Sequence, residues 1–277
     1  MNPVLLSEEE IKRLGSFRFL TERPEEGELT SAKQLINPQG LGTFLRNYSG
    51  KIGSDDKKAL SSMLIKRYAF IAVISLFSFS VFNKKLNVAP ENVFLADGEK
   101  NGLWLPGFYL EDQAAQVVSE DREKAREEVA REVFGNHLFP LIEAVKKVSK
   151  LSNLITWENV AVYMFWVYEG LIDQEDLQHA RERMKEDFEW LLDDANAGLF
   201  GSYHRNPLAR YYTQKQYVAE QDSELRVRKT CCFSYKLNDG EGSRCKTCPQ
   251  TCNVNPQKGV RRSEERRVGK ECPLLCR

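Results

Sequence analysis

Five of the chain's seven cysteines lie in one short segment near the end of the sequence. An adjacent pair, Cys231 and Cys232, is followed by the spacer 233–244 and then by Cys245 and Cys248, which form a Cys-x-x-Cys turn. Thiols are reactive, and proteins of reducing compartments use few of them without a task. Clustered cysteines of this kind indicate disulfides, a structural zinc site or an iron–sulfur cluster.

Disulfides are the weakest of these interpretations. Residues 1–10 turn acidic at once and lack the positively charged region and the apolar run of a secretory signal. We therefore expect a cytoplasmic protein, and disulfides do not persist in a reducing compartment. The cysteine segment then predicts metal binding.

Zinc and an iron–sulfur cluster both remain open. Zinc fits the turn from Cys245 to Cys248, because structural zinc sites commonly use two such chelating turns. It fits Cys231 and Cys232 less well, because adjacent side chains diverge and would chelate one ion only with local distortion. A 2Fe–2S cluster spreads four thiolates over two metals and relaxes that geometry. The residues thus favour a 2Fe–2S cluster over zinc.

The four cysteines, with Pro249 after the last of them, resemble the C-terminal signature of FhuF-like ferric siderophore reductases. The resemblance implies that Cys231, Cys232, Cys245 and Cys248 hold a 2Fe–2S cluster. It also implies a cytoplasmic oxidoreductase of iron acquisition. Such an enzyme passes one electron to Fe(III) held by a siderophore and so releases Fe(II).

The surroundings of the cysteines are also similar to that family, with one departure. Arg228 and Lys229 precede the first pair, and the aromatic run Phe233–Tyr235 follows it. The spacer is longer than the family's, and the extra residues fall in 238–243, a turn-forming stretch where insertions cost little. Cys252 lies outside the pattern, and we interpret it as a spare thiol.

The partners implied are a ferric siderophore and a source of electrons. No flavin, nicotinamide or phosphate-binding motif is evident, so the electron must come from a donor protein or a small reductant. Peripheral association with a siderophore importer is a further expectation. The alternative is a siderophore-binding or structural module with a four-cysteine zinc site and no redox activity, similar to the FhuF-like portion of siderophore synthetases.

Basic residues flank the cysteines and suggest where a substrate could bind. Positive charge favours the reduced, more negative form of a cluster and attracts an anionic ferric chelate. Aromatic faces can cover the apolar arms of a siderophore, and arginine can pair with its anionic oxygens. The predicted rim of a substrate cleft consists of Tyr211, Tyr212, Arg226, Arg228 and Arg244. The competing interpretation is that the tyrosines pack in the core and the basic residues are solvated.

Histidine ligands are a weaker possibility. His137, His179 and His204 lie far apart on different expected elements. His137 is interpreted as a hydrogen-bonded core residue, and His204 is the only histidine near the cysteine segment. A cluster with two cysteine and two histidine ligands therefore stays a minor alternative.

Composition narrows the class of protein. The 277 residues are 42% hydrophobic and 29% charged, with 40 basic and 40 acidic residues. This is the composition of a globular chain, and the absence of a basic excess argues against a nucleic-acid binder.

Hydrophobic periodicity predicts a mainly helical chain. A short amphipathic helix is expected over 4–22, with Ser7 and Glu10 as a capping box. Tyr68–Phe82 carries no charge over fifteen residues. Because a membrane span needs about twenty, we predict a buried core helix. Three more helices are expected. The first is long and begins at Ser119–Asp121, and the other two span Leu154–Gly170 and Asp173–Ala195.

Strands and turns are fewer. Asn92–Ala96 and Leu103–Leu110 predict a hairpin around the turn 97–102, and Pro106 suggests that its second strand lies at a sheet edge. Residues 30–35 begin a strand or a short helix. Gly40–Gly42 lacks the third glycine of a dinucleotide fingerprint and is interpreted as a tight turn.

The predicted fold class is α+β and mainly helical, with a small antiparallel hairpin sheet and a C-terminal cysteine lobe. Residues 1–220 are expected to form a helical siderophore-binding body, and residues 221–256 the cluster segment. Residues 262–272 match the in-frame translation of a common sequencing adapter, and we therefore expect the tail 262–277, with Cys272 and Cys276, to be non-native.

Overall fold

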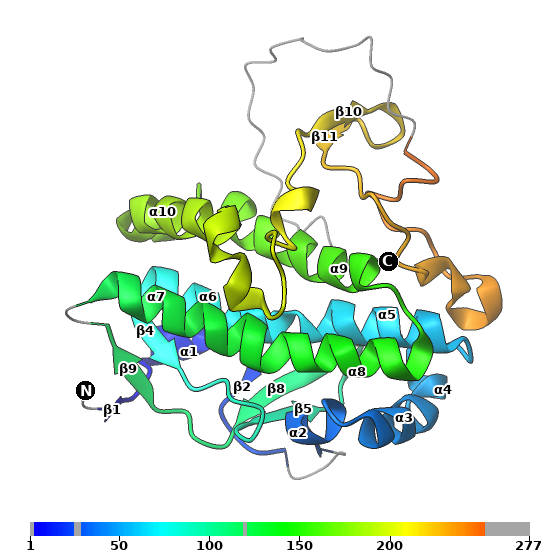
Figure 1. Cartoon of the computed structure of the whole chain (residues 1–277), viewed down its shortest axis with the longest axis horizontal. Helices are drawn as coiled ribbons and strands as arrows, with labels where there is room; N and C mark the ends of the chain where they lie inside the picture. The colour runs from blue at the N-terminus through cyan, green and yellow to red at the C-terminus, as the bar shows by residue number, and fades with distance from the viewer. Residues whose placement is uncertain (1–2, 25–28, 119–120, 253–277) are drawn as a thin grey trace.

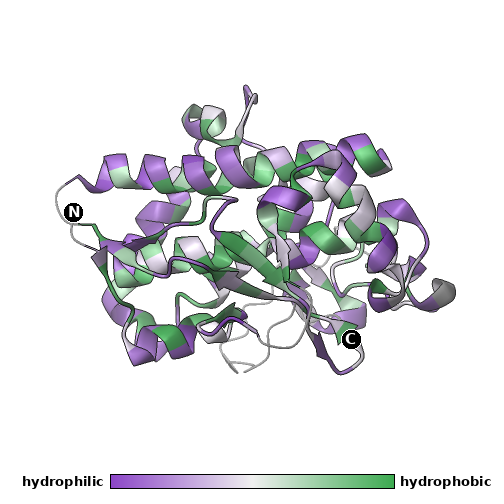
Figure 2. Ribbon diagram, turned by 90° about the horizontal axis from the view of Figure 1, so that it is seen from below, coloured by the Kyte–Doolittle hydropathy of each residue, from purple (hydrophilic) through white to green (hydrophobic). Residues whose placement is uncertain are grey.

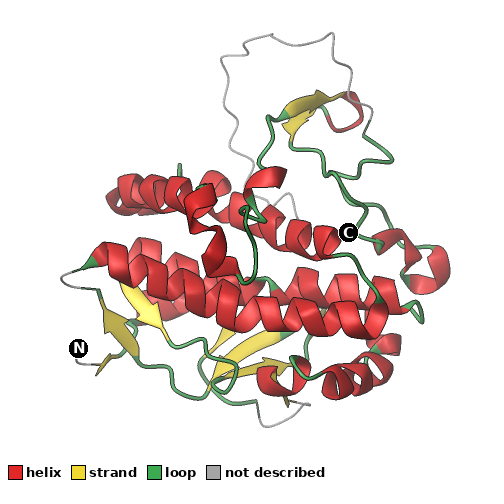
Figure 3. Ribbon diagram, in the orientation of Figure 1, coloured by secondary structure: helices red, strands yellow, loops and turns green. Residues whose placement is uncertain are grey.

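The computed structural model of the chain describes residues 3–24, 29–118 and 121–252. The predicted non-native tail at 262–277 lies outside the described residues. Packed helices form most of the body; the strands that precede residue 118 lie on one side of it, and the strands of residues 216–225 lie on the other (Figures 1 and 3). The predicted mainly helical α+β class is confirmed.

Long helices make up the centre of the body. They are α5 (Lys57–Tyr68), α6 (Phe70–Phe82), α7 (Arg122–Ala130), α8 (Phe139–Ser149), α9 (Asn153–Phe165) and α10 (Arg181–Leu192). Two π-helical segments continue this set, η1 (Arg131–Leu138) between α7 and α8 and η2 (Trp166–Gly170) after α9. The shorter helices before them are α1 (Glu8–Gly15), α2 (Ala32–Leu35), α3 (Pro38–Asn47) and α4 (Ser49–Ile52).

The most apolar part of the chain forms the core, as predicted. Asp56 caps α5 by accepting hydrogen bonds from the Lys58 and Ala59 amides at 2.8 and 3.1 Å. The helical run Lys57–Phe82 is long and apolar enough to span a membrane by length and composition, but 94% of its most apolar window is buried inside the fold. Tyr68–Phe82 is therefore a buried core segment, interrupted only at the junction of α5 and α6.

The main sheet has the strand order β2-β8-β5-β3, and its strands are β2 (Phe19–Leu20), β8 (Gly107–Leu110), β5 (Val93–Ala96) and β3 (Leu29–Ser31). The predicted antiparallel pairing is confirmed, since β5 and β8 pair with Val93 opposite Leu110. The predicted second strand is divided, however: Leu103–Trp104 pairs with Glu99–Lys100, which lies within the predicted turn 97–102. The edge position inferred from Pro106 is wrong, because β8 also pairs with β2, in parallel. Pro106 precedes the strand and removes no ladder hydrogen bond.

The remaining strands form small ladders. They are β1 (Pro3–Val4), β9 (Ala115–Val117) and β4 (Lys84–Leu86) in one sheet, β6 (Glu99–Lys100) with β7 (Leu103–Trp104), and β10 (Gln216–Val218) with β11 (Ser223–Leu225). Seen from below, the strands at the centre of the view are mainly hydrophobic (Figure 2). Val93, Leu95, Phe108 and Leu110 of the main sheet are buried in the same hydrophobic core as the helices.

Local signals near the N-terminus were partly misleading. The capping box of α1 is present, with Ser7 Oγ accepting from the Glu10 amide at 3.2 Å and the Ser7 amide donating to Glu10 Oε2 at 2.7 Å. The helix is shorter than 4–22, however, and Leu5 lies outside it with 82% of its surface exposed. Residues 30–35 contain both the end of β3 and the helix α2.

The tight turn predicted at Gly40–Gly42 is wrong, because these residues lie inside α3. The Asn37 side chain accepts hydrogen bonds from the Gln39 and Gly40 amides at 2.9 and 3.3 Å, and Pro38 occupies the first helical position. These helix-start signals outweigh the roughly 1 kcal/mol that each interior glycine costs.

A buried carboxylate joins α10 to α6 and α7. Asp187 is 3% exposed and accepts a hydrogen bond from Ser80 at 2.7 Å. It also pairs with Arg122 at 2.5 Å and with Arg126 at 2.9 Å. Since both guanidinium groups are largely covered, removing the carboxylate leaves two poorly solvated cations without their partner.

We predict that Asp187→Ala lowers the free energy of unfolding by about 3 kcal/mol, the usual cost of breaking a buried ion pair from one side. Urea unfolding followed by circular dichroism measures this. Glu186→Ala, at the exposed neighbouring position, is the control and should change stability by less than about 0.5 kcal/mol. A loss for Asp187→Ala as small as that of the control would contradict the prediction.

Candidate functional site

The cysteine segment follows β11 and runs beside α5 and α9. Its first cysteine loop, residues 228–237, and its second cysteine loop, residues 243–252, lie against each other. The Arg228 amide donates to the Thr247 carbonyl at 2.9 Å, and the Ser234 hydroxyl also reaches across to the second loop. Pairs of cysteines that are separated in sequence are thereby brought together.

The spacer between the loops folds against the body. The Asn238 amide donates to the Gly53 carbonyl at 2.6 Å, at the turn before α5. A Cβ atom on Gly242 would lie 2.2 Å from the Ser234 carbonyl, so only glycine allows this close approach. Part of the stretch predicted to be a free surface loop is therefore docked, and insertions there are more restricted than we expected.

Two of the four candidate ligands already face each other. The Sγ atoms of Cys232 and Cys245 lie 3.9 Å apart, and these side chains are 2% and 9% exposed. Thiolates that share one tetrahedral zinc ion at the usual Zn–S length lie about 3.8 Å apart. The separation of this pair therefore suits a shared metal.

The other two candidate ligands contact other groups. Cys231 Sγ accepts a hydrogen bond from the Phe233 amide at 3.4 Å, and Cys248 Sγ lies 3.9 Å from Arg244 Nη1. Within the residues that the structure describes, no group of three or more His, Cys, Asp or Glu side chains is gathered around one point. The donor set, two thiols from each loop, fits a four-thiolate centre chemically. Metal sharing requires Cys231 and Cys248 to turn toward the central pair.

The turn after the first cysteine pair is strained. Phe233 has a φ of 61°, in the left-handed region that bulky residues rarely adopt. Such backbone persists only where the surroundings hold it in place, and it is concentrated at functional sites.

The surroundings shift the pKa values of Cys232 and Cys248 down and that of Cys245 up. The hydrogen bond that Cys232 shares with Cys245 lowers the pKa of Cys232 and raises that of Cys245. The cations of Lys66 and Arg228 favour the thiolate at both positions. Burial raises the pKa of Cys248, but hydrogen bonds from the Gln250 backbone and from Arg244 leave it below its usual value. Thiolates are the form that binds metals.

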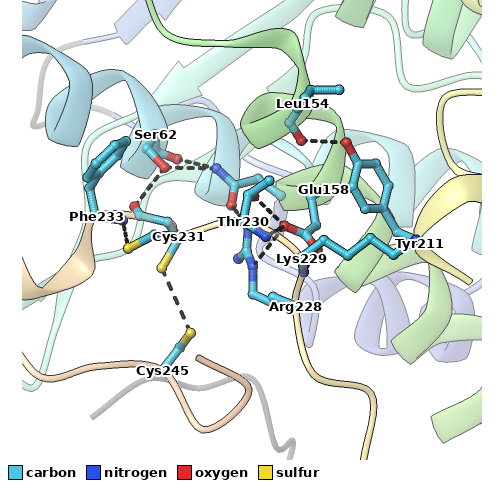
Figure 4. Close-up of polar contacts among 12 residues, drawn as sticks. Ser62, Leu154, Glu158, Tyr211, Arg228, Lys229, Thr230, Cys231, Phe233 and Cys245 are labelled. Atoms are coloured by element: carbon cyan, nitrogen blue, oxygen red, sulfur yellow. Dashed lines mark hydrogen bonds and ion pairs between the residues drawn. The ribbon is translucent and has the colours of Figure 1, made fainter. Parts of the chain in front are cut away.

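A buried carboxylate on α9 holds the first cysteine loop (Figure 4). Glu158 Oε1 accepts from the Lys229 amide at 2.5 Å, and Oε2 accepts from the Thr230 amide at 2.8 Å and also from the Thr230 hydroxyl. The Arg228 guanidinium pairs with the same carboxylate at 3.5 Å. Both side chains of this ion pair are only 2% exposed. The residues immediately before Cys231 are therefore fixed to α9.

The network continues to α5 (Figure 4). Arg228 Nη2 donates to Asn159 Oδ1 at 2.6 Å, and Asn159 Nδ2 donates to the Ser62 carbonyl and hydroxyl at 3.1 and 2.9 Å. The Ser62 hydroxyl donates to the Cys232 carbonyl at 2.7 Å. Two core helices and the cysteine pair are thus joined by one chain of buried hydrogen bonds.

Glu158, Asn159 and Ser62 were not predicted to belong to the site. A signal was present, because Glu158 and Asn159 stand side by side within the largely apolar stretch Leu154–Tyr168. A charge inside a buried helix requires a partner. Its partner, Arg228, is far away in sequence and could not be identified from the pattern.

A cavity of about 170 Å³ lies beside this network, and we call it the α9 pocket. One wall is a face of α9 and η2, made by Glu158, Val162, Phe165, Trp166, Glu169 and Gly170. The opposite wall is formed by residues 224–228 with Tyr211 and Lys215, and Thr247 of the second cysteine loop also lines the cavity.

Three of the five predicted rim residues line the α9 pocket, but not as a free basic surface. Arg228 is 5% exposed and paired with Glu158, so its cation is not free to pair with an anionic ligand. Arg226 donates to both oxygens of Glu169 at 2.9 Å. Tyr211 is buried, and its hydroxyl donates to the Leu154 carbonyl at 2.6 Å.

The other two rim residues lie outside the pocket lining. Tyr212 is 43% exposed and has the Arg226 guanidinium 4.4 Å from its ring centre. Arg244 belongs to the second cysteine loop, is exposed, and lies 4.5 Å from the Tyr235 ring centre. The structure therefore divides the predicted rim between the pocket and the cysteine loops.

Cys252 and the histidines are separate from the central pair of thiols. The Cys252 thiol donates to the Lys246 carbonyl at 3.1 Å, and burial raises its pKa. His137 is fully buried, with Nε2 2.7 Å from the Tyr68 hydroxyl and Nδ1 2.5 Å from the Val88 carbonyl, as expected of a core histidine. Burial lowers the pKa of His137 to about 4. His204 is exposed.

Comparison with known proteins identifies a family. The family described as ferric iron reductase FhuF-like transporter matches residues 62–219. This range begins at Ser62 in α5, includes Glu158 and Asn159, and ends just after β10. Among solved structures, the aerobactin synthetase IucC from a hypervirulent pathotype of Klebsiella pneumoniae is similar, with a TM-score of 0.43 and 11% identity over 68% of this chain. The chain spans 37% of that synthetase. No curated protein sequence matches significantly.

We predict that Glu158→Ala loosens the first cysteine loop. Two backbone amides lose their acceptor and Arg228 loses its carboxylate, so a loss of ~1.4 kcal/mol in the opening free energy would speed alkylation of Cys232 about tenfold. Mass spectrometry of the metal-free protein after timed alkylation measures each cysteine separately. Glu189→Ala, exposed on α10, is the control. Equal rates at Cys232 in both variants would show that the carboxylate does not hold the loop.

Proposed function

The chain belongs to the family of ferric iron reductase FhuF-like transporters, and from that membership we propose that it is a cytoplasmic ferric siderophore reductase. The observation that carries the proposal is the meeting of two cysteine loops, with the Cys232 and Cys245 sulfurs 3.9 Å apart beside the buried cation of Arg228. The substrate is Fe(III) held by a siderophore, and the product is Fe(II).

The ligands of the proposed 2Fe–2S cluster are Cys231, Cys232, Cys245 and Cys248. When bound, the cluster supplies a carrier of one electron. The electron reaches the protein from a donor protein or a small reductant, and the ferric chelate takes it up. Hard oxygen donors hold Fe(II) less tightly than Fe(III), so the chelate then releases its iron.

The protein's own residues act here by positioning. The network of Glu158, Asn159 and Ser62 fixes the backbone of the first cysteine loop, and the Arg228–Thr247 hydrogen bond fixes the second loop to it. No proton donor, base or nucleophile is needed for a one-electron transfer. The buried polar side chains of the site bind one another, and a site that only transfers an electron does not require any of them to be free for catalysis.

A second candidate function is a siderophore-binding or structural module with zinc at the four cysteines. The 3.9 Å separation of the Cys232 and Cys245 sulfurs suits a tetrahedral zinc ion equally well. Colour separates the two: a 2Fe–2S protein is red-brown and bleaches with dithionite, whereas a zinc protein is colourless. A purified protein with stoichiometric zinc and no iron would favour the module.

We predict that serine at Cys231, Cys232, Cys245 or Cys248 abolishes the visible absorbance of the anaerobically purified protein, because a neutral hydroxyl is a poor iron ligand. Iron and sulfide analysis of the same samples checks the loss. Cys252→Ser is the matched control and should keep the full absorbance, since its thiol donates to the Lys246 carbonyl. A colourless Cys252→Ser protein would show that the ligand set is misassigned.

We further predict that Arg244→Ala lowers the reduction potential of the site while leaving its absorbance unchanged. The Arg244 guanidinium lies 3.9 Å from Cys248 Sγ, and positive charge and hydrogen bonds at the sulfurs stabilise the reduced form. Lys246→Ala removes the same charge from an exposed side chain two positions away and is the control. Potentiometric titration compares them, and a shift of the same size in both variants would contradict a specific role for Arg244.

A further inference from the structure

The α9 pocket adjoins the cysteine loops directly. Its helical wall follows one face of α9 and η2, because Glu158, Val162, Phe165 and Glu169 are spaced by three or four residues. Glu158 also holds the first cysteine loop, and Thr247 belongs to the second. Any molecule in the pocket therefore lies against the residues that position the thiols.

Five of the six charged groups of the lining are already matched, and the sixth, Glu224, is an exposed carboxylate that repels anions. Arg226 binds Glu169 through two hydrogen bonds of 2.9 Å, and Lys215 approaches the same carboxylate at 3.2 Å. Arg228 is paired with Glu158. An anionic ligand would have to displace one of these carboxylates and leave it poorly solvated, which is costly. The pocket therefore suits an uncharged group.

The uncharged part of the lining is largely apolar. Val162, Phe165 and Trp166 contribute from the helical wall, and Leu225 and Val227 contribute from the opposite wall. Trp166 begins the π-helical turn η2, a kind of irregularity that often occurs at functional sites. The free energy available here comes from covering apolar surface.

The size of the pocket limits what it can hold. Sites for whole drug-sized ligands occupy roughly 300–1,000 Å³, whereas this cavity measures about 170 Å³. A compact chelate with iron at its centre exceeds that volume, but one extended arm of the chelate does not. The iron would then remain outside, where the cysteine loops line the pocket.

We propose that the α9 pocket binds one uncharged, apolar arm of the ferric chelate and so places the iron beside the cysteine loops. The proposal rests on the function proposed above and adds a substrate-binding subsite to it. It assigns recognition to the arms of the chelate, and not to the donor groups around the iron.

The experiment uses gallium(III) chelates, which are redox-inert and allow binding to be measured without reduction. One probe is an uncharged hexadentate trishydroxamate with alkyl linkers, and the other is gallium tris(acetohydroxamate), which has the same donor groups and no linkers. Isothermal titration calorimetry is carried out on the wild-type protein and on Val162→Trp, which fills the pocket. Val148→Trp, at a half-buried valine of α8 outside the lining, is the control.

We expect Val162→Trp to weaken binding of the linker-bearing chelate at least about tenfold, with unchanged circular dichroism. We expect no change for the chelate without linkers, and none in Val148→Trp. Leu225→Lys places a charge in the pocket from the opposite wall and should give the same loss, which keeps the test decisive if Val162→Trp does not fold. Equal affinities for wild type and both pocket variants would overturn the proposal, as would equal losses for the two chelates.

Failure of this proposal can be told from failure of the proposed function. The dithionite-reduced protein is mixed with the corresponding iron(III) chelate, and formation of Fe(II) is followed with a ferrous indicator dye. Linker-dependent gallium binding without Fe(II) formation would remove the reductase function and leave the subsite in place. If Val162→Trp forms Fe(II) at the wild-type rate and binds the gallium chelate with wild-type affinity, the reductase function would stand and the subsite would be removed.

Discussion

A carboxylate buried in the middle of α9 holds the candidate site together. Glu158 is 2% exposed, and an ionised group in such a place is costly unless charge and hydrogen bonds compensate it. Its partners are Arg228 and the amides of Lys229 and Thr230, all in the chain that leads into the cysteines. Moving that chain away from α9 would leave a carboxylate and a guanidinium unpaired in the core. This coupling explains how loops with little regular structure can hold buried thiols.

The site and the pocket share a rigid support. Along one face of α9, Glu158 reaches the first cysteine loop, while Val162 and Trp166, one and two turns further, line the cavity. Groups carried by a packed helix keep their distances better than groups carried by loops. Cys232, Cys245 and Cys248 also belong to the same buried core as α5 and α9. The pocket and the thiols therefore form one unit, although they are separated in sequence.

Features governed by neighbouring residues could be predicted from the sequence. The uncharged run Tyr68–Phe82, the capping box at Ser7 and the antiparallel pairing of β5 and β8 each follow from a local pattern. Where two local rules competed, the prediction failed. Glycine suggested a turn at Gly40–Gly42, but the cap at Asn37 started a helix there. The cysteine ligand set was identified from spacing and resemblance, and it stays a prediction.

Long-range pairing is what the sequence could not provide, and it changes the electrostatics of the site. Arg226 and Arg228 were predicted to be cations available to a ligand near the cysteines. In the structure Arg226 pairs with Glu169 on η2, and Arg228 pairs with Glu158 on α9. A cation with a carboxylate partner exerts little field on an approaching ligand, since the two charges cancel at a distance. Arg244 lies beside Cys248 with no carboxylate among its described contacts. The two ends of the site are therefore electrostatically unlike: the pocket is balanced and suits neutral surface, while the cysteine loops keep positive charge where a reduced centre would need it.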